Sequence, residues 1–170
     1  MNSPKKITMA DVEKETRNFF NLHWNTQQLV DVDLPYSWRA YNFIGNVPHG
    51  DRQGCYALLR DSEIIYIGLG ANRGYGKYVG CGIAARLNKH VLIWDRSVPA
   101  SVASRKYEIK EAWKRKGVTE VHTFGFPSGY GYLASSLEAF LISRLEPVEN
   151  VTKTASSSNK SIQPSRNTCC

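Results

Sequence analysis

Two short apolar segments separated by a polar turn place the strongest constraint on how this chain folds. Residues 54–60 and 63–68 are rich in apolar side chains, and a polar Asp-Ser pair at 61–62 lies between them. Apolar runs of this length around a polar turn predict an antiparallel β-hairpin. The first strand then carries Tyr56 and the second carries Tyr66.

A glycine-rich loop and a short amphipathic helix follow this hairpin. Residues 69–82 contain five glycines, and residues 83–92 place apolar side chains on one face at helical spacing. Arg86 and His90 are four positions apart beside that face, so their side chains are neighbours on the helix. Two tyrosines on paired strands that face an arginine and a histidine form a polar cluster that folding does not require. We therefore expect the function there.

The remaining sequence predicts an α/β (α+β) fold. The expected architecture is a small, mostly antiparallel three-stranded sheet flanked by helices, with an N-terminal helix added. The sheet consists of the hairpin and one later strand. The other expected elements are helices over residues 9–23, 100–116 and 132–146, a third strand over 119–125 and a short strand within 39–44.

The length of 170 residues is that of one domain of ordinary size. We expect an N-terminal helix and wrapping segment over residues 1–52, a main domain over 53–152, and a disordered polar tail over 153–170. The four cysteines lack zinc-type spacing, and Cys55 is expected in the core. No apolar run approaches the ~20 residues of a transmembrane helix, and a signal-peptide core is missing. The expected location is cytoplasmic, or nuclear in a eukaryote.

The net charge of +7 is concentrated in one part of the chain. Residues 86–116 contain nine Lys or Arg and three acids. A basic surface of this density supports contacts with the phosphates of a polyanion, although a solvated helix face balanced by acids elsewhere explains the charge equally well. The candidate DNA-binding residues in this segment are Lys89, Arg105, Lys106, Lys110 and Lys114.

Glu138 falls within the apolar arc of the helix expected over residues 132–146. A carboxylate in that position is partly desolvated, so it needs a cation, a metal ion or hydrogen-bond donors. One explanation is an ordinary ion pair, for which Arg144 is the nearest candidate. The other is a functional site.

Five features of the chain occur in the order that is typical of one enzyme superfamily. They are Gly54-Cys55-Tyr56, Tyr66-Ile67-Gly68, Arg86, Glu138 and Asn150. The two tyrosines are ten positions apart, the arginine is on the next helix, and the glutamate helix is followed by a proline and the asparagine. The chain thus resembles the GIY-YIG nuclease superfamily over residues 54–150.

This resemblance implies metal-dependent cleavage of a DNA phosphodiester. Glu138 would ligate one Mg²⁺, with Mn²⁺ as a substitute, because hard cations prefer carboxylate and phosphate oxygens. Tyr56 would be the general base for the attacking water, or the relay to one, although a free tyrosine has a pKa of ~10. Arg86 would hold the scissile phosphate and stabilise the charge that develops on it.

The resemblance gives supporting roles to three further residues. Tyr66 would position the water or the phosphate, His90 would be a hydrogen-bond partner in the site, and Asn150 would brace it. For His90 the alternative is an ordinary histidine on a helix surface.

Two departures from the family pattern refine the expectation. The first tripeptide has cysteine in the middle, where the side chain faces the core. Tyr66 and Arg86 are twenty positions apart, and the longer glycine-rich loop between them resembles the branch that contains small restriction enzymes. In that branch the loop lies beside the DNA, so Arg73 and Lys77 become candidate DNA contacts. Without a separate DNA-binding domain, binding would come from the basic segment and loops, from a homodimer, or from a DNA-targeting partner.

A shared site sets a condition on strand register. A regular two-residue turn at 61–62 would pair Tyr56 with Ile67 and leave the two tyrosines on opposite faces of the sheet. We therefore predict an odd-length loop or a β-bulge that pairs Tyr56 directly with Tyr66. The alternative to an endonuclease is a catalytically inactive scaffold that serves in DNA binding or protein assembly, and the intact set of polar residues favours the enzyme.

Overall fold

The computed structural model describes residues 6–23, 37–71, 82–97, 101–127 and 129–150. Its helices are α1 (Met9–His23), α2 (Ile83–His90), α3 (Glu111–Lys114) and α4 (Ala134–Leu145), and its 3₁₀ turns are η1 (Val102–Ser104) and η2 (Gly131–Leu133). Its strands are β1 (Arg39–Tyr41), β2 (Gly54–Arg60), β3 (Glu63–Gly70), β4 (Leu92–Trp94), β5 (Tyr107–Ile109) and β6 (Glu120–Gly125). The tail predicted to be disordered and most of the glycine-rich loop lie outside these ranges.

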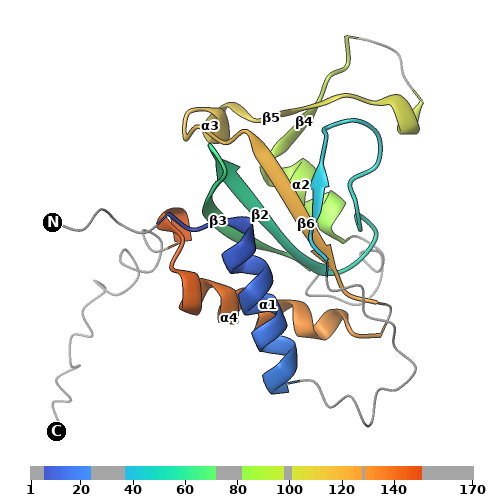
Figure 1. Ribbon diagram of the computed structural model, residues 1–170. Helices are drawn as coiled ribbons and strands as arrows, with labels where there is room; N and C mark the ends of the chain where they lie inside the picture. The colour runs from blue at the N-terminus through green and yellow to red at the C-terminus, as the bar shows by residue number, and fades with distance from the viewer. Residues whose placement is uncertain (1–5, 24–36, 72–81, 98–100, 128, 151–170) are drawn as a thin grey trace, which may run out of the picture.

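The α/β class predicted from the sequence is confirmed, but the main sheet has four strands rather than three. Its order is β1-β6-β2-β3, and every neighbouring pair is antiparallel. The additional strand is β1, which pairs with β6 through residues that the sequence predicted only as a short strand. Strands β4 and β5 form a separate two-stranded sheet. Figure 1 shows α1 and α4 on one side of the main sheet and α2 on the other.

Helix α1 forms over the predicted residues because its first turn is capped. The carboxylate of Asp11 accepts hydrogen bonds from the backbone N–H and the hydroxyl of Thr8, at 2.9 and 2.7 Å. These contacts satisfy polar groups at the helix start. The helix packs against α4, with the rings of Phe19 and Phe140 5.5 Å apart. None of the helices in the described residues is long and apolar enough to cross a membrane.

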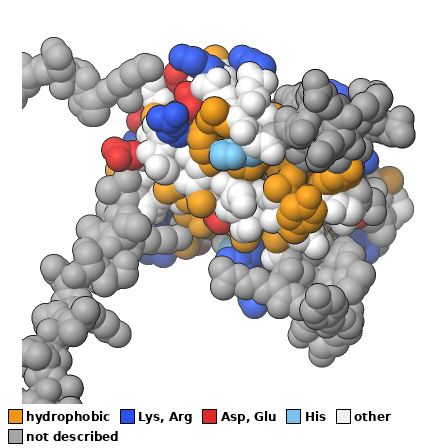
Figure 2. All heavy atoms as spheres, turned by 90° about the horizontal axis from the view of Figure 1, so that it is seen from below, with side chains coloured by type: hydrophobic (Ala, Val, Ile, Leu, Met, Phe, Trp, Pro, Cys, Tyr) orange, Lys and Arg blue, Asp and Glu red, His pale blue; other side chains and the backbone are white. Residues whose placement is uncertain are grey.

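Two hydrophobic cores cover the opposite faces of the main sheet. The first joins α1 and α4 to the sheet and includes Cys55, Ile67 and Leu137. The second joins α2 and the β4–β5 sheet to the other face and includes Tyr56, Leu58 and Leu87. Adjacent residues 55 and 56 thus belong to different cores, as the alternation of a strand requires. In the view from below α1 and α4, hydrophobic side chains also gather on the surface (Figure 2).

The β2–β3 hairpin contains the predicted irregularity, but its register differs from the prediction. Asp61 and Ser62 form a two-residue turn with positive φ angles of 48° and 62°, as tight hairpins require. A β-bulge between Leu58 and Leu59 then shifts the pairing by one residue. Beyond the bulge, Tyr56 pairs with Gly68 and Leu58 pairs with Tyr66. The two tyrosines are therefore diagonal neighbours on one face, and the predicted direct pairing is wrong.

The predicted helix over residues 100–116 is also wrong, because the described part of this segment holds η1, β5 and the four-residue α3. Strand β5 pairs with β4, so that Ile109 lies opposite the buried Leu92. Burial of these side chains outweighs the helix propensity of the surrounding lysines, arginines and glutamates. The same pairing ends α2 at His90, two residues before the predicted end.

Candidate active site

Tyr56 and Tyr66 form the centre of the candidate site. Their ring centroids are 6.0 Å apart with the ring planes inclined at 42°, and the Tyr56 hydroxyl is hydrogen-bonded to the Tyr66 side chain. Tyr56 is only 2 % exposed, whereas Tyr66 is half-buried. The β-bulge brings both rings to the α2 face of the sheet, as the shared site requires.

Gly68 provides the space that the Tyr56 ring occupies. A Cβ atom on Gly68 would lie 2.4 Å from Cζ of Tyr56 and 2.7 Å from Cε1 of Tyr66, closer than van der Waals contact permits. The direct partner of Tyr56 across the ladder must therefore lack a side chain. The glycine of the second tripeptide thus has a steric role in placing the tyrosine pair.

The surroundings of Tyr56 keep its hydroxyl protonated. Burial raises the pKa of Tyr56 well above its usual value, and the neighbouring Tyr66 and the negative charge of Glu138 raise it further. The guanidinium of Arg86 acts in the opposite direction and lowers the pKa. At neutral pH, Tyr56 is therefore a neutral phenol that can donate a hydrogen bond.

Helix α2 places Arg86 beside the tyrosine pair. Ile83 and Leu87 are buried against the sheet, whereas Arg86 and His90 are exposed. The positive charge of Arg86 is close enough to Tyr56 to change its pKa, so these two predicted residues lie near one another. An exposed guanidinium next to a tyrosine pair can bind a phosphate group.

Trp113 connects the tyrosine pair to the end of α2. Its ring centroid lies 5.1 Å from that of Tyr66, and its indole N–H donates a hydrogen bond to the backbone carbonyl of His90 at 3.1 Å. Sequence reasoning gave Trp113 no part in the site. The sequence spacing between Trp113 and Tyr66 does not indicate this contact, because it is strand β5 that brings Trp113 to Tyr66 in the fold.

Glu138 approaches the site from α4, which packs on the opposite face of the sheet from α2. The carboxylate is half-buried, and its negative charge raises the pKa of both Tyr56 and Cys55, although burial is the larger cause for each. Cys55 is fully buried, with its Sγ 3.3 Å from the Ala134 carbonyl, as expected for a core residue. The suggested partner Arg144 lies 3.9 Å from the carboxylate of Glu15.

The sequence proposes a single protein ligand for a metal ion, the carboxylate of Glu138. Within the described residues, no group of three or more His, Cys, Asp or Glu side chains is placed to hold a metal. Glu138 instead fits the kind of site in which Mg²⁺ uses one carboxylate, water molecules and the phosphates of a substrate.

Asn150 braces the second tyrosine strand rather than joining the polar cluster. Its side-chain oxygen accepts a hydrogen bond from the backbone N–H of Ile67, and its amide nitrogen donates one to the Ile67 carbonyl, both at 2.8 Å. Asn150 is buried, and β3 is the edge strand of the sheet. The asparagine therefore satisfies two backbone groups that no strand in the described part of the chain reaches.

The candidate DNA-binding residues differ in their contacts. Lys110 donates hydrogen bonds to the carbonyls of Asn88 and Lys89 at the end of α2, at 3.0 and 2.7 Å, and Lys114 pairs with Glu108 at 2.8 Å. Lys89 and Lys106 have exposed side chains, and Arg105 is half-buried against Trp94. Arg73 and Lys77 lie outside the described residues.

His49 was not singled out from the sequence. Its Nδ1 is buried and has no hydrogen-bond partner among the described residues. Burial lowers the pKa of His49, and the positive charge of Arg52 lowers it further. A lone histidine in an irregular segment carries no sequence signal that its ring is buried and its pKa lowered.

Comparison with known proteins gives no relative for this chain: no family model, no curated protein and no solved structure matches it.

Proposed function

We propose that this protein is a metal-dependent DNA endonuclease of the GIY-YIG type. The observation that carries the proposal is the tyrosine pair on one face of the hairpin, within the electrostatic influence of Arg86 and Glu138. Polar side chains from β3, α2 and α4 thus all influence the Tyr56 hydroxyl on β2. Their types suit phosphodiester hydrolysis, and their order along the chain matches the GIY-YIG resemblance.

The chemistry divides among these residues according to exposure. Arg86 is exposed and can bind the scissile phosphate, where its charge stabilises the additional negative charge of the transition state. Tyr66 is half-buried and can orient the attacking water with its hydroxyl. Magnesium bound through Glu138 would supply charge neutralisation and a water of lowered pKa.

The raised pKa of Tyr56 favours a relay over a permanent phenolate. A neutral Tyr56 hydroxyl beside Tyr66 can accept the proton of the attacking water as it passes its own proton to the Tyr66 hydroxyl, and the half-buried Tyr66 in turn releases one to solvent. The positive charge of Arg86 assists by lowering the pKa of Tyr56. Tyr56→Phe would break the relay and leave the ring packing intact.

A second candidate is a non-catalytic module that uses the same scaffold for DNA binding or protein assembly. The burial of Tyr56 favours it, because a side chain that is 2 % exposed has little direct access to a substrate. The position of Glu138 on the helix layer opposite α2 favours it as well. This candidate requires no cleavage and no metal.

A nicking assay separates the two candidates. Supercoiled plasmid is incubated with Mg²⁺ and wild-type protein, Glu138→Gln, Arg86→Gln or Tyr56→Phe. Charge-matched controls on α1 are Glu13→Gln and Arg17→Gln, which lie across the sheet from α2. We expect wild-type protein and both controls to nick, and the Glu138 and Arg86 variants to lose about 100-fold or more in rate.

Equal nicking by all six proteins would reject this site, since a contaminating nuclease would explain it. No nicking by the wild type, on plasmid or on branched DNA and with either Mg²⁺ or Mn²⁺, would reject the endonuclease. Retained DNA binding in a gel-shift assay would then favour the non-catalytic module.

A further inference from the structure

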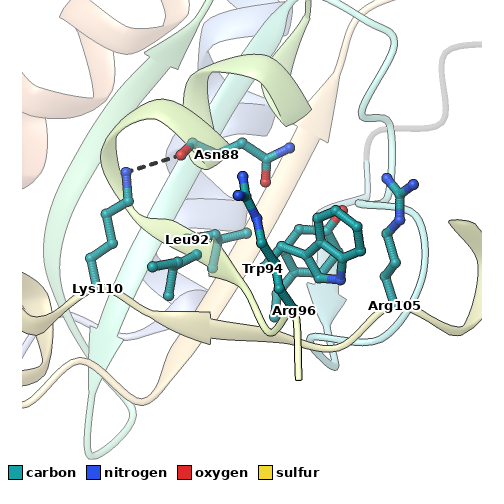
Figure 3. Close-up of a pocket in the computed structure, with 8 residues that line it drawn as sticks. Asn88, Leu92, Trp94, Arg96, Arg105 and Lys110 are labelled. Carbon is teal, nitrogen blue, oxygen red and sulfur yellow. Dashed lines mark hydrogen bonds between the residues drawn. The ribbon is translucent and has the colours of Figure 1, made fainter. Parts of the chain in front are cut away.

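An open cavity of about 590 Å³ lies between the β4–β5 hairpin and the C-terminal half of α2. Figure 3 shows Arg96 and Arg105 on the two sides of Trp94, with Asn88 and Lys110 at the rim. None of the eight lining residues is acidic. They are Asn88, Leu92, Ile93, Trp94, Arg96, Arg105, Tyr107 and Lys110.

The indole ring of Trp94 contacts both arginines of this cavity. The guanidinium carbon of Arg105 is 4.2 Å from the centroid of the Trp94 ring, and that of Arg96 is 5.8 Å from it. Both distances are those of cation–π contacts, which favour arginine on an indole face. The ring therefore contacts one positive group on each of its two sides before any ligand is present.

The positive charge of the two arginines is not neutralised by ion pairs within the described residues. Arg105 is half-buried, and its Nε and the Trp94 Nε1 are buried with no hydrogen-bond acceptor in that part of the chain. The neighbouring Asp95 carboxylate accepts a hydrogen bond from the backbone N–H of Ser97 at 2.9 Å. A partly desolvated guanidinium that lacks an anion is costly, and a bound anion offsets that cost.

We propose that this cavity binds a backbone phosphate of DNA at a position away from the cleavage site. Arg96 and Arg105 each provide a guanidinium that can donate to phosphate oxygens, and the exposed side chain of Ile93 can contact the sugar. A free phosphate group offers the same chemistry, but the exposed side of α2 favours a polymer. It carries Arg86 and Lys89, which extend a positive surface from the tyrosine pair to the cavity.

The inference rests on the proposed function only in taking DNA as the ligand, so its test measures binding without cleavage. Fluorescence anisotropy of a labelled 20-base-pair duplex is recorded in EDTA over a series of salt concentrations. The variants are Arg96→Gln and Arg105→Gln, and the charge-matched control is Arg17→Gln on α1. Arg96 is exposed, so its variant remains informative if Arg105→Gln fails to fold.

Each cavity variant is expected to weaken duplex binding about tenfold, since a charge-assisted contact is lost. The slope of log affinity against log salt should fall by about one for each variant. The Arg17 control should match the wild type in both affinity and salt dependence. Affinities and slopes of both cavity variants equal to those of the control would overturn the proposal, even if the protein proves to be a nuclease.

A second arm distinguishes DNA from a small phosphate ligand. Deoxyadenosine monophosphate and inorganic phosphate are titrated as competitors at millimolar concentration. Weak competition by both, which is lost in the Arg96 variant, supports a phosphate of a polymer. Micromolar binding of the mononucleotide together with unchanged duplex binding in the variants would assign the cavity to a free nucleotide instead.

Discussion

The ring of Tyr56 lies over the backbone of Gly68, its direct partner across the β2–β3 ladder. A Cβ atom at Gly68 would be 2.4 Å from Cζ and 2.6 Å from the hydroxyl oxygen of Tyr56. The hydroxyl that interacts with Tyr66 therefore occupies space that any other residue at 68 would fill. The position of the tyrosine pair depends on this one missing side chain.

Gly68→Ala is expected to displace the Tyr56 ring. The new methyl group overpacks a buried position, so the free energy of unfolding should decrease by about 1–3 kcal/mol. DNA cleavage by the folded fraction should also decrease, because the hydrogen bond between the tyrosines is disturbed. Urea unfolding and the nicking assay measure the two effects.

A double-mutant cycle tests the cause of this loss. Where Tyr56 is already alanine, only the close contact with Cε1 of Tyr66 remains, and Gly68→Ala should cost less. An equal cost in both backgrounds would show that the alanine disturbs the strand by itself and not through Tyr56.

Asn150→Ala is expected to destabilise the hairpin edge. The change removes two buried hydrogen bonds and leaves the N–H and C=O of Ile67 without partners, so we expect a loss of about 2–4 kcal/mol. Thermal or urea unfolding measures it. Asn42→Ala is the matched control, since Asn42 makes one exposed hydrogen bond with the N–H of Ile44. A cost no greater than that of the control would contradict the bracing role.

The raised pKa of Tyr56 predicts a loss of stability in alkaline solution. An unfolded tyrosine loses its proton near pH 10, while the folded protein retains the proton of Tyr56 to higher pH. Unfolding then releases a proton, so stability falls as pH rises above about 10, by up to about 1.4 kcal/mol per pH unit. Below pH 9 this contribution is constant.

Tyr56→Phe should therefore reduce the pH dependence of urea unfolding between pH 10 and 11 without abolishing it, because burial also raises the pKa of Tyr41. Tyr132→Phe is the control, because Tyr132 is 68 % exposed and should leave the slope unchanged. Identical slopes in wild-type protein and Tyr56→Phe would show that Tyr56 titrates like a solvent-exposed tyrosine.

Lys110 and Lys114 should differ in their contribution to stability. Lys110 donates to two carbonyls at the end of α2, so Lys110→Met is expected to lower the free energy of unfolding by about 1 kcal/mol. Lys114 forms an exposed pair with Glu108, and Lys114→Met should cost less than Lys110→Met. A cost for Lys114→Met equal to that for Lys110→Met would contradict the capping role.

Local sequence predicts the elements better than their register. The helix over residues 9–23 and the two hairpin strands form where the apolar pattern indicates. The site of the β-bulge does not follow from that pattern, because Ile64 and Ile65 are both apolar and suit either face. Only the requirement of a shared tyrosine site predicted that a bulge exists, and it did not predict the partner of Tyr56.

In the basic segment, by contrast, the sequence pattern predicted the wrong secondary-structure elements. Between residues 100 and 116, lysine, arginine and glutamate favour a helix by propensity. The strand partner of Ile109 is β4, and the sequence pattern assigned the start of β4 to the end of the preceding helix. The cavity at Trp94 depends on that hairpin and was therefore not predictable. Of the candidate site, the pattern indicated the residues on β2, β3 and α2, while the contact of Trp113 with Tyr66 required the tertiary structure.

The amide of Asn150 also affects how this molecule meets its own copies. An edge strand offers unpaired backbone groups to any extended chain, and this is a common route to intermolecular sheets and aggregation. At Ile67, Asn150 occupies both groups in the way that a neighbouring strand would. The residue that positions the second tyrosine strand thus also removes, at Ile67, two backbone groups that a strand of another copy could pair with.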